Sequence, residues 1–221
     1  IKILFKKILD NTSPKSAANK FRKERFRYFT ELIRNDTLPI RILDIGGTEN
    51  FWVQMGFYAN ENYQITVLNI DVHQTHTKEN LTFVHGDARD LSQFGDKKFD
   101  VVFSNSVIEH IPFEAGRKQM AAEIIRTGKK YFVQTPNYYF PFEPHFLFPC
   151  FQFLPKAIKI LMLRSFNMGW FKKCGSREEA EELLSMNKLL KFNELRTYFP
   201  DARIIKERFL YMTKSYISVY P

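Results

Sequence analysis

A succession of short apolar runs, each followed by polar residues or glycine, constrains the fold of this chain more than any other feature. Polar or helical stretches separate the runs, which lie at 40–45, 65–70, 81–84, 99–104 and 130–134. Most of the runs are continuously apolar rather than alternating, as expected for strands that are covered on both faces. The pattern predicts a parallel sheet with crossover helices, and a helix is expected over 112–127.

The end of the chain carries two further apolar runs, at 203–210 and 214–220. Only three residues, 211–213, separate them, too few for the helical crossover that parallel strands need. We therefore expect an antiparallel pair here. The fold class predicted is α/β, a Rossmann-like, mostly parallel seven-stranded sheet with a C-terminal antiparallel hairpin.

The segments outside this pattern suggest a division into four parts. Residues 1–37 read as a basic helical arm, which Ser13 and Pro14 break into a short first piece and a longer second one. Residues 38–137 form the predicted core, 138–191 an insertion, and 192–221 the last helix and the hairpin. The insertion is expected to lie over the carboxyl ends of the strands, where open α/β sheets bind ligands.

The insertion is rich in phenylalanine, of which the whole chain has 23. Regularly spaced prolines exclude a continuous helix from its first half, whereas 157–163 and 176–190 look helical. Its phenylalanines have two interpretations, an apolar pocket for a substrate or simple packing of the insertion on the sheet. The residues concerned are Phe140, Phe142, Phe146, Phe148, Phe151 and Phe153.

Two predicted strands end in residues suited to hold a nucleotide-like ligand. The first run contains Asp44 and is followed by Gly46 and Gly47, and a turn without Cβ atoms lets backbone N–H groups approach a ligand. The second run ends in Asn69, with Asp71 two residues further on, about where a Rossmann-like unit binds a ribose. Taken singly, the glycine pair could be only a turn.

The next two strands end in the same manner. Asp87 and Ala88 follow the third run, and Ser104 and Asn105 end the fourth. Asp87 alone could be an ordinary helix cap. Because parallel strands end at one edge of a sheet, the four ends together predict one contiguous polar rim.

The motifs DIGG, NID, GDA, FDVVFSNSVIEH and YFVQTPN, in this order over residues 40–137, resemble the class I S-adenosylmethionine-dependent methyltransferases, especially the type 11 methyltransferase-domain family. The resemblance implies S-adenosylmethionine as cofactor. It implies Asp44 and the glycine pair beside the methionine part, and Asn69 or Asp71 at the ribose. It also implies Asp87 and the backbone of Ala88 at the adenine, and Ser104 and Asn105 on the methionine and substrate side.

The first motif departs from the family pattern, because Thr48 and Glu49 stand where a third glycine is usual. Candidates for a general base, needed only if the acceptor loses a proton, are His110, Glu143 and His145. His110 could equally pack at the start of a helix. Glu143 and His145 lie in a proline-containing loop near the strand ends, which favours a role in the pocket.

The function predicted is O- or N-methylation of a small-molecule or a lipid- or sugar-linked acceptor. The alternatives are a non-catalytic protein that binds S-adenosylmethionine or a nucleotide, an RNA methyltransferase, and a nucleotide-dependent oxidoreductase. The last lacks its G-x-G-x-x-G motif here. No nucleic-acid recognition module is evident, so nucleic acid is not the expected partner.

Charge and cysteine usage bear on partners and location. Residues 1–41 hold 11 Lys and Arg against 4 Asp and Glu, which suits either an anionic partner or a solvated helix face. Lys156 and Lys159 beside apolar residues suggest an interfacial helix and peripheral membrane contact. Cys150 and Cys174 have no metal-binding spacing, so we expect no metal site and a cytoplasmic protein. The sequence indicates no oligomeric state.

Overall fold

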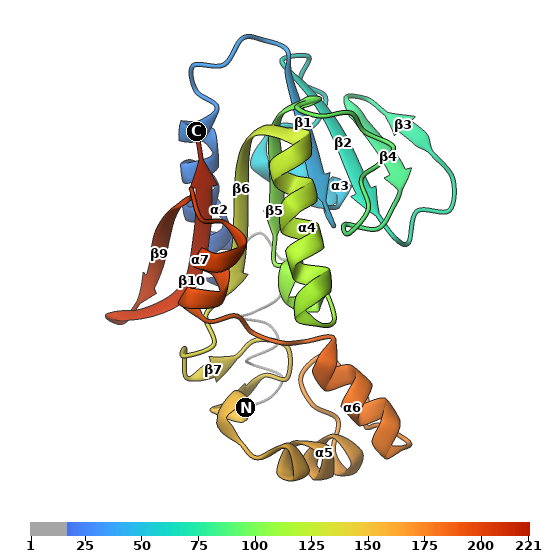
Figure 1. Cartoon of the computed structure of the whole chain (residues 1–221), viewed down its shortest axis with the longest axis vertical. Helices are drawn as coiled ribbons and strands as arrows, with labels where there is room; N and C mark the ends of the chain where they lie inside the picture. Colours follow the sequence, from blue (N-terminus) through green and yellow to red (C-terminus); the bar gives the residue numbers. More distant parts are fainter. Residues whose placement is uncertain (1–16) are drawn as a thin grey trace.

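The computed structural model describes residues 17–221, and its centre is one eight-stranded sheet (Figure 1). The strand order is β3-β4-β2-β1-β5-β6-β10-β9. The strands are β1 Ile40–Ile45, β2 Tyr63–Asn69, β3 His76–Lys78, β4 Leu81–His85, β5 Phe99–Asn105, β6 Gly128–Pro136, β9 Arg203–Phe209 and β10 Met212–Tyr220.

The pairing confirms the predicted fold class. Strands β4, β2, β1, β5 and β6 are parallel neighbours, whereas β10 runs antiparallel between β6 and β9. The central strands are almost wholly buried, as their continuous apolar runs require. The predicted number of strands was too small by one, because β3 adds an antiparallel edge to β4. All three residues of β3 are exposed, so no apolar pattern marked it.

Helices cover both faces of the sheet. Apolar side chains of α4 and α7 pack on one face, and those of α2 and α3 pack on the other. The sheet is therefore doubly wound, which places its ligand-binding edge at the carboxyl ends of the strands. The helices outside the insertion are α2 Ala17–Leu32, α3 Glu49–Met55, α4 Glu114–Thr127 and α7 Phe192–Tyr198.

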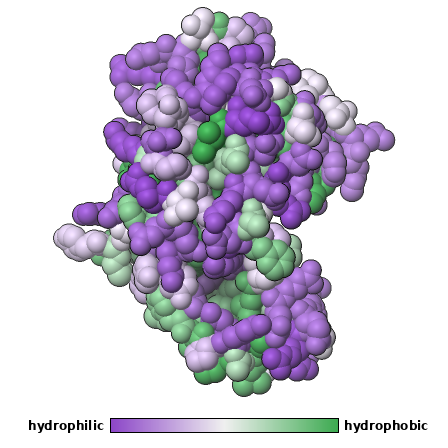
Figure 2. All heavy atoms as spheres, in the orientation of Figure 1, coloured by the Kyte–Doolittle hydropathy of each residue, from purple (hydrophilic) through white to green (hydrophobic). Residues whose placement is uncertain are grey.

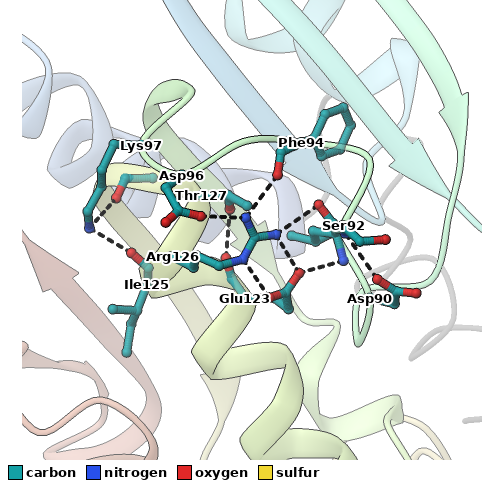
Figure 3. A network of polar contacts seen from close by, with 11 residues as sticks. Asp90, Ser92, Phe94, Asp96, Lys97, Glu123, Ile125, Arg126 and Thr127 are labelled. Atoms are coloured by element: carbon teal, nitrogen blue, oxygen red, sulfur yellow. Dashed lines mark hydrogen bonds and ion pairs between the residues drawn. The ribbon is translucent and has the colours of Figure 1, made fainter.

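The C-terminal end of α4 forms hydrogen bonds and ion pairs with the loop that follows β4 (Figure 3). Arg126 donates to both carboxylate oxygens of Glu123, to Asp96 and to the carbonyl oxygens of Leu91 and Phe94. The planar guanidinium of Arg126 thereby donates to two loop carbonyl groups that lie outside the sheet. The network holds the loop of residues 90–97 against the helix that crosses from β5 to β6.

Residues 138–191, called the cap below, extend beyond the carboxyl ends of β5 and β6 (Figure 1). The bridge between Asn137 and Leu190 and the bond from the N–H of Lys188 to the carbonyl of Glu109 join the cap to the core. The first half is irregular and the second half helical, as predicted. Its elements are β7 Phe142–Glu143, β8 Phe148–Pro149, α5 Lys156–Ser165, α6 Arg177–Ser185 and the short 3-10 helix η2 Phe151–Phe153.

The cap has a small apolar core of its own. Phe146 and Phe151 are buried in it together with Ile160 and Leu163 of α5. For these two phenylalanines the packing interpretation is the right one. Phe148 and Phe153, in contrast, are exposed.

The longer second piece of the predicted arm is α2, whereas its first piece, before the Ser13–Pro14 break, lies outside the described residues. Phe26 and Phe29 of α2 are buried against Trp52 and Phe103, which fixes the helix to the sheet. Within residues 17–221 no helix combines the length and the apolar composition that a membrane span requires.

Candidate active site

The end of β1 is organised around a buried carboxylate. Asp44 is 1% exposed, and its Oδ2 accepts a hydrogen bond of 2.7 Å from Nε1 of Trp52 in α3. A Cβ atom at Gly47 would lie 1.6 Å from that oxygen, so only glycine fits. Gly46 has a φ of +73°, a backbone conformation that glycine adopts without strain. Gly47 is thus required by the position of Asp44, and Gly46 by the backbone conformation of the turn.

Burial raises the pKa of Asp44 to about 7, and the hydrogen bond from Trp52 opposes this effect only in part. A carboxylate in an apolar setting loses its hydration, and the neutral indole donor returns little of it. A positive charge close to Asp44 would therefore stabilise its ionised form. The side chain itself lies beneath the glycine turn.

The ends of β2 and β4 place further polar groups on the same edge. Oδ1 of Asn69 accepts from the backbone N–H of Asp71, and Asp71 is exposed. Asp87 forms an ion pair of 2.5 Å with Arg89, which lowers the pKa of the Asp87 carboxyl, and Ala88 is buried behind it. We call the set Asp44, Gly46, Gly47, Asn69, Asp71, Asp87 and Ala88 the cofactor edge.

The end of β5 is held by a residue that sequence reasoning missed. Arg25 of α2 donates from Nη1 to Oδ1 of Asn105 over 2.6 Å and forms an ion pair of 3.0 Å with Glu207 of β9. Ser104 is fully buried, and its Oγ has no hydrogen-bond partner among the described residues. Arg25 was hidden in the basic arm because its charge pattern does not differ from that of its neighbours.

The predicted base candidates converge at the junction between the sheet and the cap. The rings of His110 and His145 are in edge-on contact, with their centroids 4.7 Å apart. Nδ1 of His145 lies 2.7 Å from Oε1 of Glu143, whose Oε2 accepts from the N–H of Phe146. Nδ1 of His110 lies 3.1 Å from the carbonyl oxygen of Met186.

A fourth member of this group, Glu109, was not predicted. It is fully buried, and its Oε2 accepts from the hydroxyl of Thr135 in β6 at 3.0 Å. Its signal lay in the sequence, in the dipeptide Glu109-His110, but the burial of a glutamate cannot be read from its neighbours. We call the set Glu109, His110, Thr135, Glu143 and His145 the junction cluster.

Two buried carboxylates dominate the electrostatics of the junction cluster. Burial lowers the pKa of His145, but the hydrogen bond to Glu143 and the charges of Glu143 and Glu109 outweigh it, so the net shift is upward. Among residues 17–221 no Lys or Arg forms an ion pair with Glu109 or Glu143. The cluster therefore stabilises positive charge at the imidazole of His145.

Residues 43–131 match the family model of the methyltransferase domain. Two uncharacterized proteins from strains of Mycobacterium tuberculosis are each 47% identical over 58 residues, a match that covers 25% of this chain and 19% of theirs. The segment that matches thus spans about a fifth of the length of those relatives.

Several solved structures have a similar fold. A methyltransferase from Methanosarcina mazei has a TM-score of 0.53 at 15% identity, covering 85% of this chain and 94% of that one. The CurJ carbon methyltransferase has a TM-score of 0.55 at 14% identity, covering 93% and 55%. One from Aquifex aeolicus scores 0.50 at 10% identity, covering 91% of each. The fold is that of class I methyltransferases, and S-adenosylmethionine is the cofactor that the matched domain implies.

The residues of the cofactor edge fit that group. The cofactor carries positive charge on its sulfonium and ammonium groups, and Asp44, Asp71 and Asp87 supply negative charge along the edge. At Gly47 no Cβ fits, because the Asp44 carboxylate packs against this turn. The unsatisfied hydroxyl of Ser104 is a further hydrogen-bonding group next to this turn.

Proposed function

We propose that this protein transfers the methyl group of S-adenosylmethionine to an acceptor held between the strand ends and the cap, because residues 43–131 match the model of the methyltransferase domain and the sheet has the corresponding fold. The observation that carries the proposal is the order of the strand ends. β4, β2, β1 and β5 are neighbours in the sheet, and each ends in polar residues or is followed by them.

We assign the cofactor edge in the same order. Asp44, Gly46 and Gly47 are proposed for the methionine part, and Asn69 or Asp71 for the ribose. Asp87 and the backbone of Ala88 are proposed for the adenine. To accept from an adenine amino group, Asp87 has to share its carboxylate with Arg89 or release it.

When bound, the cofactor supplies an activated methyl group on a sulfonium sulfur. The protein's own work is to orient the acceptor in line with that group and to exclude water. Ser104 and Asn105 are proposed for this side of the site. Arg25 fixes the amide of Asn105 and is itself fixed by Glu207, so the orientation does not depend on a mobile side chain.

The junction cluster is proposed as the acceptor side. His110, Glu143 and His145 lie where β5 and β6 meet the cap, next to the fourth-strand residues. Imidazoles beside buried carboxylates can take a proton from a hydroxyl or ammonium acceptor, directly or through a bound cation. The acceptor class proposed is a small molecule or a lipid- or sugar-linked compound with an oxygen or nitrogen acceptor atom.

The test starts with calorimetry of the full chain against S-adenosylhomocysteine and, in parallel, NAD. Binding of the first and not of the second is expected, and the reverse result would overturn the proposal in favour of an oxidoreductase. Turnover is then followed with labelled methyl donor over a panel of hydroxyl and amine acceptors. Tight binding without methylation of any acceptor in cell extract would favour the non-catalytic alternative.

A second property, contact with a membrane surface, is proposed from the cap. Apolar side chains gather on this end of the molecule (Figure 2). Several large ones are exposed, and cationic residues that are also exposed flank them. The apolar set is Phe148, Phe153, Ile158, Leu161, Phe166 and Trp170, and the cationic set is Lys156, Arg164, Lys172 and Lys173.

This surface differs from the one that the sequence suggested. Ile160 and Leu163 face the core of the cap, and Lys159 donates to the carbonyl of Gln152. Ile158 and Leu161 are the members of α5 that remain exposed. An apolar face with a cationic rim suits anionic phospholipid, which we propose as its occupant.

Flotation with vesicles tests this contact. Wild-type protein is expected to float with vesicles that contain phosphatidylserine and to float less as salt rises. Leu161→Asp should reduce the floated fraction several-fold, whereas Tyr211→Asp, at an exposed aromatic residue outside the cap, should leave it unchanged. Equal loss in both variants, or no flotation of wild type, would discard the contact.

A further inference from the structure

The junction cluster has the composition and arrangement of a metal site. We propose that Glu109, His110 and His145 bind one divalent first-row transition-metal ion such as Zn²⁺ where the sheet meets the cap. Each offers one ligand atom, and the three atoms lie within 4.8 Å of one another. Two imidazoles and one carboxylate are a common ligand set for zinc sites that keep a further position open.

The hydrogen bonds of the histidines leave the right atoms free. The carbonyl oxygen of Met186 can only accept, so the Nδ1 of His110 bonded to it carries the proton. The carboxylate of Glu143 likewise accepts from Nδ1 of His145. Each neutral ring then has its lone pair on Nε2. Metal-binding histidines are oriented in this manner, by a carboxylate or a backbone carbonyl behind the ring.

The third ligand gives an independent indication. Glu109 is fully buried, and its Oε1 has no hydrogen-bond partner within the described residues. A buried carboxylate oxygen without a donor is costly, and a cation is the partner that would satisfy it. Thr135 holds the other oxygen and so restricts the direction in which Oε1 points.

The spacing requires only a small adjustment. Ligand atoms about 2.0–2.1 Å from a tetrahedral ion are about 3.3 Å apart. The ligand atoms of the three residues are at most 4.8 Å apart, so side-chain movements of about 1.5 Å would bring them to this spacing. Glu109 and His110 belong to the short 3-10 helix η1 Ile108–His110 next to the end of β5, whereas His145 belongs to the cap. The ion would therefore fasten the cap to the core.

The sequence did not predict this metal site, because His110 and His145 are 35 positions apart and no cysteine contributes a ligand. The ligands also distinguish the class of ion. Imidazole nitrogens suit Zn²⁺, Co²⁺ or Ni²⁺ better than Mg²⁺, Ca²⁺ or Mn²⁺, which prefer oxygen. The role of the ion rests on the proposed function. On the acceptor side it would bind an acceptor hydroxyl at its open position and lower the pKa of that hydroxyl, so the proton would pass to solvent and the two histidines would act as ligands rather than as bases.

The experiment uses the full chain without an affinity tag, freed of metal by chelation and dialysis. Titration with Co²⁺ followed by visible absorption should give one ion per chain with the intense bands of a four- or five-coordinate site. Competition with Zn²⁺ should bleach those bands. S-adenosylhomocysteine binding is measured on the same samples, so a failure of the proposed function is distinguished from a failure of the metal site.

Variants decide between this site and adventitious binding. Glu109→Gln and His145→Ala should each weaken Co²⁺ binding at least 100-fold. Glu143→Gln, which replaces the carboxylate behind His145 by a neutral amide, should weaken it about 10- to 100-fold. His85→Ala is the matched control, because Nδ1 of His85 also faces a backbone carbonyl but the ring is exposed and lies outside the cluster.

Thermal unfolding provides a second readout if one variant folds poorly. Saturating Zn²⁺ should raise the Tm of wild type and of His85→Ala, and not that of Glu109→Gln. Absence of one-to-one binding in wild type would overturn the proposal. Equal affinity in Glu109→Gln and wild type would overturn it as well.

Discussion

The cofactor edge and the junction cluster are both built on buried carboxylates, yet they are assembled over very different distances in the sequence. Asp44 is bonded to Trp52, eight residues away, and Asp87 to Arg89, two residues away. Glu109 is bonded to Thr135 across 26 residues, and His110 to Met186 across 76. The first region needs only the sheet and its adjoining turns, whereas the second exists only when the cap is docked.

The charge arrangement differs in the same way. At the cofactor edge a neutral donor faces Asp44, so burial dominates and its pKa rises. At the junction Glu143 faces an imidazole that can be cationic, and Glu109 retains one unsatisfied oxygen. Asp44 and Asp87 each accept from a side-chain donor, whereas Oε1 of Glu109 has no partner within residues 17–221 and could accept a cation. Predictions that separate the two regions test this difference.

Substitution of Gly47 is expected to have the largest effect. In Gly47→Ala the new Cβ would lie 1.6 Å from Oδ2 of Asp44, so the turn or the carboxylate must move. We expect at least 100-fold weaker binding of S-adenosylhomocysteine in calorimetry and a loss of stability of about 1–3 kcal/mol or more in urea unfolding. Co²⁺ binding at the junction should persist.

Gly95→Ala is the matched control, because nothing lies within 4 Å of a Cβ there and the backbone is not left-handed. It should be close to wild type in both assays. Should Gly47→Ala bind the cofactor product normally, the glycine turn would not be part of the site. Loss of Co²⁺ binding in a folded Gly47→Ala protein would contradict the independence of the two regions.

How far the sequence predicts each region follows from the same distances. The end of β1 could be predicted because Asp44, Gly46 and Gly47 lie in one continuous motif after an apolar run. The strands and the closing hairpin were predictable for the same reason, since apolar periodicity is a local signal. The exposed β3 lacks that signal and was missed.

The junction could be predicted only as separate candidates. His110, Glu143 and His145 were each plausible from residue type, but nothing local indicates that the two rings touch. Glu109 and Arg25 were missed because their importance in the structure follows from burial, and burial depends on packing between distant elements. The assignments of individual residues to cofactor and acceptor stay predictions.

After the loss of ligand binding in Gly47→Ala, the largest change is expected in the stability of Asp44→Asn as a function of pH. The folded-state pKa of about 7 lies above the ordinary value of 3.8, so the folded protein binds the proton more tightly than the unfolded chain. Wild-type stability from this group is therefore full below about pH 4 and is lost as pH rises towards 7. The loss is of order 4 kcal/mol at most.

Asparagine keeps an oxygen that can accept from Trp52 and removes the titration. Urea unfolding between pH 4 and 8 should show that the stability of Asp44→Asn rises relative to that of wild type up to about pH 7. Above pH 7 the stabilities of the two proteins should change in parallel. A difference between the two proteins that is independent of pH would show that Asp44 is ionised throughout. Asp71→Asn, at an exposed carboxyl, serves as the control.

A smaller effect is expected at the junction from Thr135→Val. Valine has nearly the shape of threonine but lacks the hydroxyl that donates to Oε2 of Glu109. Leaving this buried oxygen without a donor should cost about 1–3 kcal/mol in the metal-free protein. Saturating Zn²⁺ should return part of the loss, because the ion gives the carboxylate a partner. An equal loss with and without Zn²⁺ would argue against metal ligation by Glu109.

The smallest effects are expected at Asp87. Unlike Glu109, this carboxylate already has a partner, Arg89. Asp87→Asn should weaken S-adenosylhomocysteine binding by about 10-fold or less, since the amide oxygen still accepts a hydrogen bond and only part of the about 1.5–3 kcal/mol of a charged acceptor is lost. Arg89→Ala removes a partly exposed ion pair, worth at most about 1 kcal/mol, and should change the same affinity by less than about 5-fold.

The direction of the Arg89→Ala effect carries the information. Tighter binding would mean that Arg89 competes with the adenine for Asp87, as the 2.5 Å pair suggests. Weaker binding would mean that Arg89 holds the carboxylate in the position that the ligand needs. If Asp87→Asn binds as tightly as wild type, the adenine does not reach the end of β4, and the cofactor edge is limited to β1 and β2. In either case Co²⁺ affinity should not change, because the junction cluster shares no residue with this loop.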